Sequence, residues 1–329
     1  MELTYIYMVI GFTLAAYSVV ANDSVQTLGT FIASNSDKFK WYILAGAASL
    51  VLCLTLLNGW YFHGDISYGR LNKIPFQEIK WYHAAAPGFL LLLTRFGIPV
   101  STTFLVLSAF ASTVVLEKVL IKSVIGYALA AVIAYALWIV ISRYINEKFD
   151  EVKNPERWRV FQWLTTGFLW YTWLSHDMAN IAVFLPRDLP FVMLLAIMGL
   201  LTFLLFYIFY EKGGRIQKIV LEKTGTRFVR SATIIDGVYA FILLYFKFYN
   251  DIPMSTTWVF VGLLCGRELA IATVVSDYKL GYVFPIIGKD FLKMIMGLLV
   301  SVAIVLAIHY VIIPGGYEDI NLSLAWLRL

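Results

Sequence analysis

The sequence predicts an all-α polytopic membrane protein made of two inverted-topology repeats. Three observations lead to this prediction: the composition, the long apolar segments, and a set of polar motifs that occurs twice. Of the 329 residues, 60% are hydrophobic and 14% are charged, and the mean hydropathy is +0.77. Soluble domains carry about 25% charged residues, so this chain needs an apolar environment. Each repeat is expected to contain transmembrane helices, a broken helix and a re-entrant helical hairpin.

Four apolar segments are long enough to cross a bilayer, which takes about 20 apolar residues. They lie at residues 41–62, 123–145, 189–210 and 290–313. Two further helices are expected at 3–20 and 157–175, each running into a polar cluster. The segment 3–20 has no basic start and no small-residue cleavage site, so it is interpreted as a retained helix and not as a signal peptide.

Two more apolar stretches, 81–116 and 232–270, are each interrupted by a proline followed by three hydroxyl residues. The interruptions read GIPVSTT and DIPMSTT. Because Pro99 and Pro253 cannot continue a helix, the chain is expected to turn there. A new helix should then begin at the hydroxyl residues, since Ser and Thr are good N-caps. Each stretch therefore predicts a helical hairpin.

The polar motifs recur at a constant spacing of 154 positions, which indicates an internal repeat. The pairs at this spacing are Asn22 with His176, Asp23 with Asp177, Gln26 with Asn180, and Ser101, Thr102 and Thr103 with Ser255, Thr256 and Thr257. The predicted repeats are residues 1–146 and 159–329, joined by a charged cytoplasmic linker at 147–158. An odd number of crossings per repeat would invert the second repeat, as in many secondary transporters.

The lysines and arginines predict the orientation, because cytoplasmic loops carry an excess of both. The arrangement that places most of them inside has both termini outside the cell membrane. It also puts the first hairpin on the outer side and the second on the inner side. The net charge of +5 is thereby explained by topology, and no nucleic-acid partner is expected.

The hydroxyl motifs predict an anion site. A helix that starts within a membrane leaves about four unpaired N–H groups and the positive end of a dipole. Two such starts would meet at the centre and offer six hydroxyls, those of Ser101, Thr102, Thr103, Ser255, Thr256 and Thr257. This set suits a small tetrahedral oxyanion. The alternative, which stays open, is that the motifs only cap two interior helices.

Asp23 and Asp177 predict a cation site, because an acid within apolar sequence is costly in a bilayer and is usually functional. The candidate cation ligands are Asn22, Asp23, Gln26, Thr30, His176, Asp177 and Asn180. Their oxygens suit Na⁺, while His176 could titrate near neutral pH. The open alternative is that both acids end helices at the membrane surface. No other metal and no cofactor is expected, since no nucleotide motif or metal-binding histidine pair occurs.

Other charges also interrupt apolar sequence. Arg95 and Asp251 flank the two hairpin tips, where they could pair or where Arg95 could add charge to the anion site. The alternative is that each reaches a hydrated cavity. Asp236 is expected near the inner surface, at the start of the second hairpin.

Four motifs together resemble those of the PiT-type inorganic phosphate transporters, a family that includes sulfate permeases. They are VANDSVQTLGT, GIPVSTTF, SHDMANIAVF and DIPMSTTW, in the family's order. The resemblance implies alternating access and cation-coupled phosphate uptake, with Asp23 and Asp177 serving the cation and the hydroxyl motifs holding the anion. The chain departs from the family at Gln26 and His176, where asparagine is usual, and at Phe104 and Trp258, where histidine is usual.

The predicted function is therefore secondary active transport of inorganic phosphate, coupled to Na⁺ or H⁺, and not enzymatic catalysis. The first alternative is an H⁺-coupled sulfate permease on the same scaffold. An anion channel and an intramembrane enzyme with an Asp23–Asp177 dyad are the others. The expected partners are phosphate or sulfate and the lipid bilayer, and a homodimer stays open.

Overall fold

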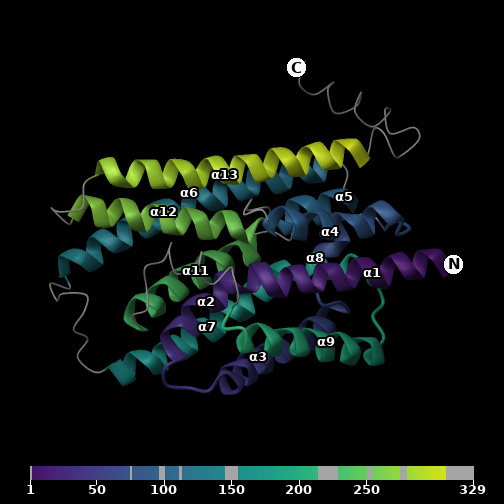
Figure 1. Cartoon of the computed structure of the whole chain (residues 1–329), viewed down its shortest axis with the longest axis horizontal. Coiled ribbons are helices and arrows are strands. Elements are labelled where there is room, and N and C mark those ends of the chain that lie inside the picture. Colours follow the sequence, from purple (N-terminus) through teal and green to yellow (C-terminus); the bar gives the residue numbers. More distant parts are fainter. Residues whose placement is uncertain are drawn as a thin grey trace, which may run out of the picture.

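The computed structural model describes residues 2–74, 76–95, 101–110, 113–144, 155–213, 229–249, 254–274 and 280–308. These residues form helices and connecting loops without a β-strand, which confirms the predicted all-α class (Figure 1). Six helical segments in this described part are long and apolar enough to cross a bilayer. They are Leu3–Ala21, Trp41–His63, Glu117–Val140, Phe191–Tyr210, Thr256–Val274 and Val283–Ala307.

The first helix does not end at its acidic residue. Helix α1 (Glu2–Ser18) continues through a π-helical turn, η1 (Val19–Asp23), into α2 (Ser24–Asn35). A π-turn inserts one extra residue into a helix and is frequent at functional sites. Asp23 therefore lies within a helix that extends about twelve residues beyond it, and not at a helix end on the membrane surface.

The rest of the first half contains two long helices and the first hydroxyl motif. Helix α3 (Trp41–His63) ends at Gly64, whose positive φ of 75° lets its N–H bond to the Trp60 carbonyl. A loop with the short helix η2 (Arg70–Lys73) leads to α4 (Trp81–Arg95). After the hydroxyl motif come η3 (Thr103–Leu107), α5 (Ser108–Phe110) and α6 (Thr113–Tyr144), and both η3 and α5 pack against α4.

The second half begins with the broken helix. Helix α7 (Pro155–Asp177) is followed by the short α8 (Ala179–Ala182) and then by α9 (Phe191–Tyr210). Helices α11 (Val229–Tyr249), α12 (Thr256–Val274) and α13 (Leu280–Ala307) complete the described chain. Residues 155–158, expected in the linker, form the first turn of α7, while 147–154 lie outside the described residues.

The four segments predicted from hydropathy alone coincide largely with helices α3, α6, α9 and α13. Residues 189 and 190 precede α9, and residue 145 lies outside the described residues. Helices α6 and α13 begin about ten residues earlier than predicted. Glu117, Lys118 and Lys122 lower the hydropathy of the first turns of α6, whereas Pro285, Lys289 and Asp290 interrupt the apolar start of α13. Residues 309–313 of the last predicted segment lie outside the described residues.

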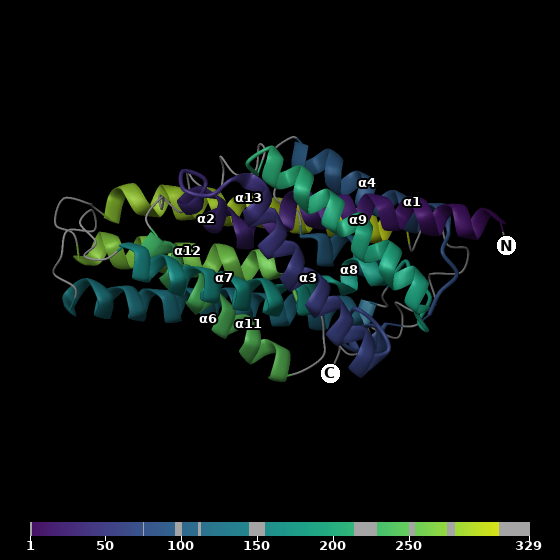
Figure 2. The ribbon, with the colours of Figure 1, turned by 90° about the horizontal axis from the view of Figure 1, so that it is seen from below.

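Helices α6, α12 and α13 run side by side along one flank, as both ribbon views show (Figures 1 and 2). Gly262 and Gly266 of α12 allow the close approach to α6. A Cβ atom on Gly262 would clash with the Tyr127 carbonyl oxygen, and one on Gly266 would clash with that of Ala131. Small residues four apart are the usual means of bringing two membrane helices into backbone contact.

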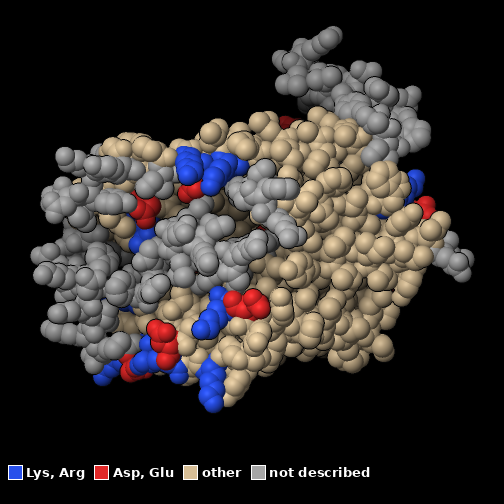
Figure 3. Space-filling view, viewed as in Figure 1, with Lys and Arg blue, Asp and Glu red and all other residues tan. Residues whose placement is uncertain are grey.

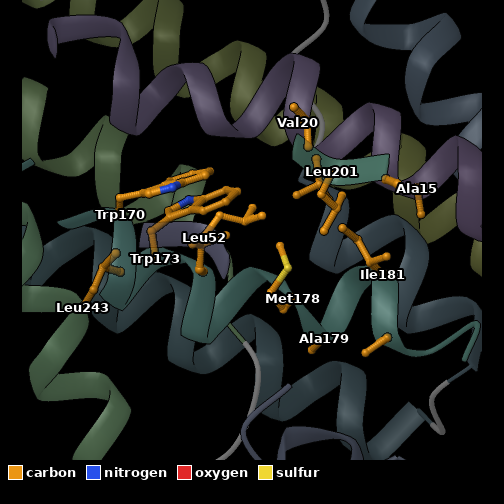
Figure 4. Close-up of a cluster of buried hydrophobic side chains, with 14 of the residues drawn as sticks. Ala15, Val20, Leu52, Trp170, Trp173, Met178, Ala179, Ile181, Leu201 and Leu243 are labelled. Carbon is orange, nitrogen blue, oxygen red and sulfur yellow. The ribbon is translucent and has the colours of Figure 1, made fainter. Parts of the chain in front are cut away.

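A tryptophan pair marks the core on the other side of the molecule. The rings of Trp170 and Trp173 stack with centroids 5.1 Å apart, and they pack with Leu52 and Leu243 (Figure 4). The surface, in contrast, exposes many large apolar side chains, among them Leu3, Leu50 and Phe248. In Figure 3 the right side of the molecule, over α1 and α4, is almost entirely uncharged. Among the described residues, charged side chains are seen there only at the right-hand edge. This distribution fits a protein surrounded by lipid.

Candidate functional site

The first carboxylate is held in the π-turn between α1 and α2. Asp23 is the last residue of η1, and its side chain is buried. Its Oδ2 accepts a hydrogen bond from the Thr102 hydroxyl, which belongs to the first hydroxyl motif. The acidic motif near the N-terminus and the first hydroxyl motif are thus joined directly.

The second carboxylate is held where α7 ends. The helix breaks at Met178, and the short helix α8 then returns Asn180 toward Asp177, so that Nδ2 of Asn180 donates to Oδ1 of Asp177 over 3.0 Å. The Thr256 hydroxyl of the second hydroxyl motif lies beside the same carboxylate. Asp177 and Asn180 are both buried, so this polar group is surrounded by protein.

The two serines of the hydroxyl motifs cap the helices that follow them. Ser101 Oγ accepts from the N–H of Phe104, and Ser255 Oγ accepts from the N–H of Trp258, each over 3.4 Å. This is the hydrogen bond that an N-cap makes to the first helical turn. The capping expected of both motifs is therefore present, and each serine keeps its own proton for donation to a ligand.

Two longer hydrogen bonds connect each half to the other. Nε2 of Gln26 donates to the Thr257 hydroxyl over 3.3 Å, and Nδ2 of Asn180 donates to the Thr103 hydroxyl over 3.4 Å. Gln26 and Asn180 are repeat equivalents, and so are Thr103 and Thr257. The same relation holds for the Asp23–Thr102 and Asp177–Thr256 neighbours. The site is therefore built from two pairs of matching contacts. In the first pair, Asp23 with Thr102 and Asp177 with Thr256, each contact lies within one half. In the second pair, Gln26 with Thr257 and Asn180 with Thr103, each contact joins the two halves.

Three buried oxygen atoms at this site have no hydrogen-bond donor among the described residues. They are Oε1 of Gln26, Oδ2 of Asp177 and Oδ1 of Asn180. Buried polar atoms are nearly always partnered, so such a group needs an explanation, such as an ion. Carboxylate and amide oxygens are the ligands that hard cations use. The residues present thus fit a small cation.

Thr30 does not join the Asp23 group. Its hydroxyl donates to Oδ1 of Asp236 over 2.8 Å, and the Thr166 hydroxyl donates to Oδ2 over 2.5 Å. Asp236 is 1% exposed. Asp236 is therefore enclosed by α2, α7 and α11, and its expected position near the inner surface stays a prediction. In the sequence, the only indication that Asp236 would be buried is that apolar residues surround it.

His176 serves as a bridge between three parts of the chain. Its Nε2 lies 2.8 Å from the Leu243 carbonyl oxygen of α11, and its Nδ1 lies 3.2 Å from Nη2 of Arg70. A carbonyl can only accept, so Nε2 carries the proton and Nδ1 accepts from Arg70. Arg70 also donates to the carbonyl of Ser175. Both ring nitrogens of His176 are thus used by the protein.

Arg70 was not predicted at the site. It is 1% exposed and lies in η2, in the loop between α3 and α4. No local sequence pattern distinguishes it from other loop arginines. The loop also receives two hydrogen bonds from Arg187, to the carbonyls of Leu71 and Ile74. It is thereby fastened against the segment between α8 and α9.

Phe104 and Trp258, the residues directly after the two hydroxyl motifs, pack against each other. Their ring centroids are 5.5 Å apart, and both side chains are buried. Their contact forms an apolar partition next to the polar site. Several other predicted residues lie outside the described part: Pro99, Asp251 and Pro253 entirely, and Asn22 and Arg95 in their side chains.

No family model matches the chain. A sequence comparison finds a protein named "Putative phosphate permease" from Pyrococcus furiosus, 23% identical over 235 residues, which are 63% of this chain and 54% of the relative. The chain thus spans about half the length of the curated relative that it matches. In contrast, a structural match to a solved protein covers almost all of this chain and almost all of the solved chain.

A solved structure described as "The sodium-dependent phosphate transporter" superimposes with a TM-score of 0.63. The match covers 93% of this chain and 97% of that chain at 17% sequence identity. At this identity the likeness shows the fold, and the described chain therefore has a transporter fold. The sequence and the structure comparisons agree with the resemblance that the four motifs predicted.

Proposed function

We propose that this chain, which has the fold of a sodium-dependent phosphate transporter and is related to a named phosphate permease, is a secondary active transporter of inorganic phosphate. Both proteins are named for transport and neither for an enzymatic reaction, which supports a transporter over an enzyme. The crossed contacts between the two halves are the observation that carries the proposal. They bring both hydroxyl motifs and both acidic motifs into one buried group.

The anion is assigned to the two hydroxyl motifs. The two motifs offer hydroxyls and the first amides of two helices, and such donors suit a tetrahedral oxyanion, which needs no apolar contact. The cation, Na⁺ or H⁺, is assigned to Asp23, Gln26, Asp177 and Asn180. Their oxygens lie next to the hydroxyls of Thr102, Thr256 and Thr257, so the two ligands would occupy adjacent positions.

The Thr102 hydroxyl explains how the two ligands are coupled. It has a single proton, and in the structure it donates that proton to Asp23. A cation on Asp23 satisfies the carboxylate, and the hydroxyl can then turn and donate to the anion. Each ligand thereby favours binding of the other, as the reciprocity of linked equilibria requires.

Alternating access would follow from the two halves acting as inverted repeats. The matching contacts at a spacing of 154 positions support such a relation. Rocking one half against the other would exchange the bonds that cross between them, Gln26 to Thr257 and Asn180 to Thr103. The proposal places both termini outside, following the distribution of lysine and arginine.

An aspartyl enzyme is less well supported. A catalytic pair of carboxylates shares one proton through direct contact. Among the described contacts, Asp23 is bonded to Thr102 and Asp177 to Asn180, and no hydrogen bond joins the two acids.

The test is uptake of labelled phosphate into proteoliposomes under an imposed Na⁺ gradient, then under a proton gradient, and with unlabelled sulfate as competitor. Uptake that follows either gradient supports the proposal and identifies the coupling ion. Ser101→Ala and Ser255→Ala should weaken the apparent phosphate affinity by about 1–3 kcal/mol, the usual loss for a buried hydrogen bond.

The matched control is Ser301→Ala, since Ser301 is equally buried but bonds only to a carbonyl within α13. Uptake that ignores both gradients, with conductance through the membrane, would indicate a channel. Complete inhibition by an equal concentration of sulfate would move the substrate assignment to sulfate.

A further inference from the structure

A second polar region lies outside the transport site. An open-sided cavity of about 350 Å³ is formed where the loop at 36–40, the start of α3 and the end of α9 meet. Three lysines line it, Lys38, Lys40 and Lys212, together with one acid, Asp37. Its lining contains none of the residues assigned to phosphate or to the cation. The cavity therefore needs an explanation of its own.

The lysines are not all neutralised by the protein. Lys38 pairs with Glu156 of α7. Lys40 has its Nζ 5.9 Å from the centre of the Tyr42 ring, and neither Lys40 nor Lys212 takes part in an ion pair within the described residues. With Asp37 as the one acid in the lining, the cavity carries net positive charge. It fits an anionic ligand.

The backbone at Lys212 adds a second, independent observation. Lys212 is the second residue after α9 and has a φ of 52°, in the left-handed region that glycine and asparagine normally occupy at such positions. The N–H of Lys212 bonds to the Phe209 carbonyl, and that of Gly213 bonds to the Ile208 carbonyl, so the turn is well formed. Glycine would adopt this backbone conformation at lower cost than lysine. A lysine held in it therefore indicates that the charged side chain has a role at this position.

The surroundings place the cavity at the edge of the bilayer. The Trp41 ring packs edge-on against Tyr210, with centroids 5.4 Å apart, and both side chains are exposed. Aromatic side chains of this kind mark the level of the lipid headgroups. Further along, α3 and α9 expose Leu50, Leu54 and Phe203. A ligand in the cavity could therefore place its charge on the lysines and an apolar chain along these helices.

We propose that this cavity binds the phosphate headgroup of an anionic membrane lipid. Basic pockets beside transmembrane helices on the cytoplasmic side recognise such headgroups, and the predicted orientation puts residues 36–40 on that side. A free phosphate ion offers the same charge to the lysines, but it leaves the exposed apolar surface without a partner. The apolar surface and the aromatic level favour the lipid.

The test measures thermal unfolding of the purified full-length chain in neutral detergent, with short-chain phosphatidylglycerol, short-chain phosphatidylcholine or inorganic phosphate added. Phosphatidylglycerol should stabilise the protein at lower concentration than phosphatidylcholine. Lys40→Ala and Lys212→Asn should each raise the half-saturating concentration of phosphatidylglycerol about fivefold, as expected for one lysine near an anionic lipid.

The substitutions at position 212 are matched. Asparagine tolerates the left-handed conformation without the charge, whereas Lys212→Arg keeps the charge and should leave the response unchanged. Lys118→Ala, at an exposed lysine of α6 outside the cavity, should also change nothing. Equal responses to the two lipids, or an unchanged response in Lys40→Ala and Lys212→Asn, would overturn the proposal. If these two variants alter the response to inorganic phosphate instead, the site belongs to a free anion.

Discussion

The two acidic clusters reach the same contacts by different backbones. Asp23 lies in a π-turn of a helix that continues to Asn35, whereas Asp177 lies at the end of a helix that breaks. Each carboxylate nevertheless lies beside the middle threonine of the hydroxyl motif in its own half. The two halves therefore share these pairs of side chains but do not share the same backbone path around the acid.

The helices after the hydroxyl motifs differ in the same way. The first motif leads into the five-residue π-helix η3, while the second leads into the regular, 19-residue helix α12. The position before each acid differs too, because His176 is fastened to both Arg70 and Leu243. The second half is therefore tied to η2 and α11 at the residue before its acid. Four predictions test how far the two halves are equivalent.

The largest effect is expected from removing either carboxylate charge. Asp23→Asn and Asp177→Asn should each reduce cation-driven phosphate uptake at least about 30-fold, because a buried ion loses its charged partner. Uptake into proteoliposomes measures this loss, and Asp188→Asn, in the exposed loop before α9, is the control. If Asp177→Asn kept its cation dependence, one half alone would carry the cation.

The next effect concerns the pair of rings beside the site. Phe104→Ala and Trp258→Ala should each lower the free energy of unfolding by about 3–5 kcal/mol, because a large buried ring leaves a cavity. Thermal or denaturant unfolding in detergent measures the change. Phe248→Ala removes a ring that is 79% exposed and should have little effect. A loss at only one of the two positions would show that the halves are packed unequally.

A smaller effect is expected at Thr30. Thr30→Val should cost about 1–3 kcal/mol of stability, because Asp236 loses one of its two hydroxyl donors. The apparent cation affinity should stay within about twofold, in an uptake assay at varied Na⁺ or pH. Thr13→Val, on the exposed side of α1, controls for loss of a hydroxyl. A tenfold fall in cation affinity with unchanged stability would return Thr30 to the cation site.

The smallest effect is expected at Gln26, whose side chain is one methylene longer than that of its equivalent, Asn180. Gln26→Asn gives the first half the shorter side chain that Asn180 provides in the second. The shorter amide loses its bond to Thr257, and the apparent cation affinity should fall about three- to tenfold, as for one hydrogen bond of about 1 kcal/mol. Cation titration of uptake measures this change, and a gain in affinity would contradict the assignment of Gln26.

Much of the site could be predicted because its residues stand out locally. Acids and hydroxyl triplets within apolar sequence are conspicuous, and their constant spacing relates the two halves without any structure. The pairing of Thr30 with Asp236 could not be predicted in this way. The two residues are 206 positions apart, and their contact depends on how α2, α7 and α11 pack.

The sequence by itself determined the helices, the transporter fold class and the two motif sets, because membrane-length apolar segments and repeated polar motifs are properties of the chain order. Only the tertiary structure decided which polar atoms meet. It joined Gln26 to Thr257 and Asn180 to Thr103, turned His176 toward Arg70 and left three buried oxygens without a hydrogen-bond donor among the described residues. Hydrogen bonds act over about 3 Å, and such distances follow from the packing of helices and not from spacing along the chain.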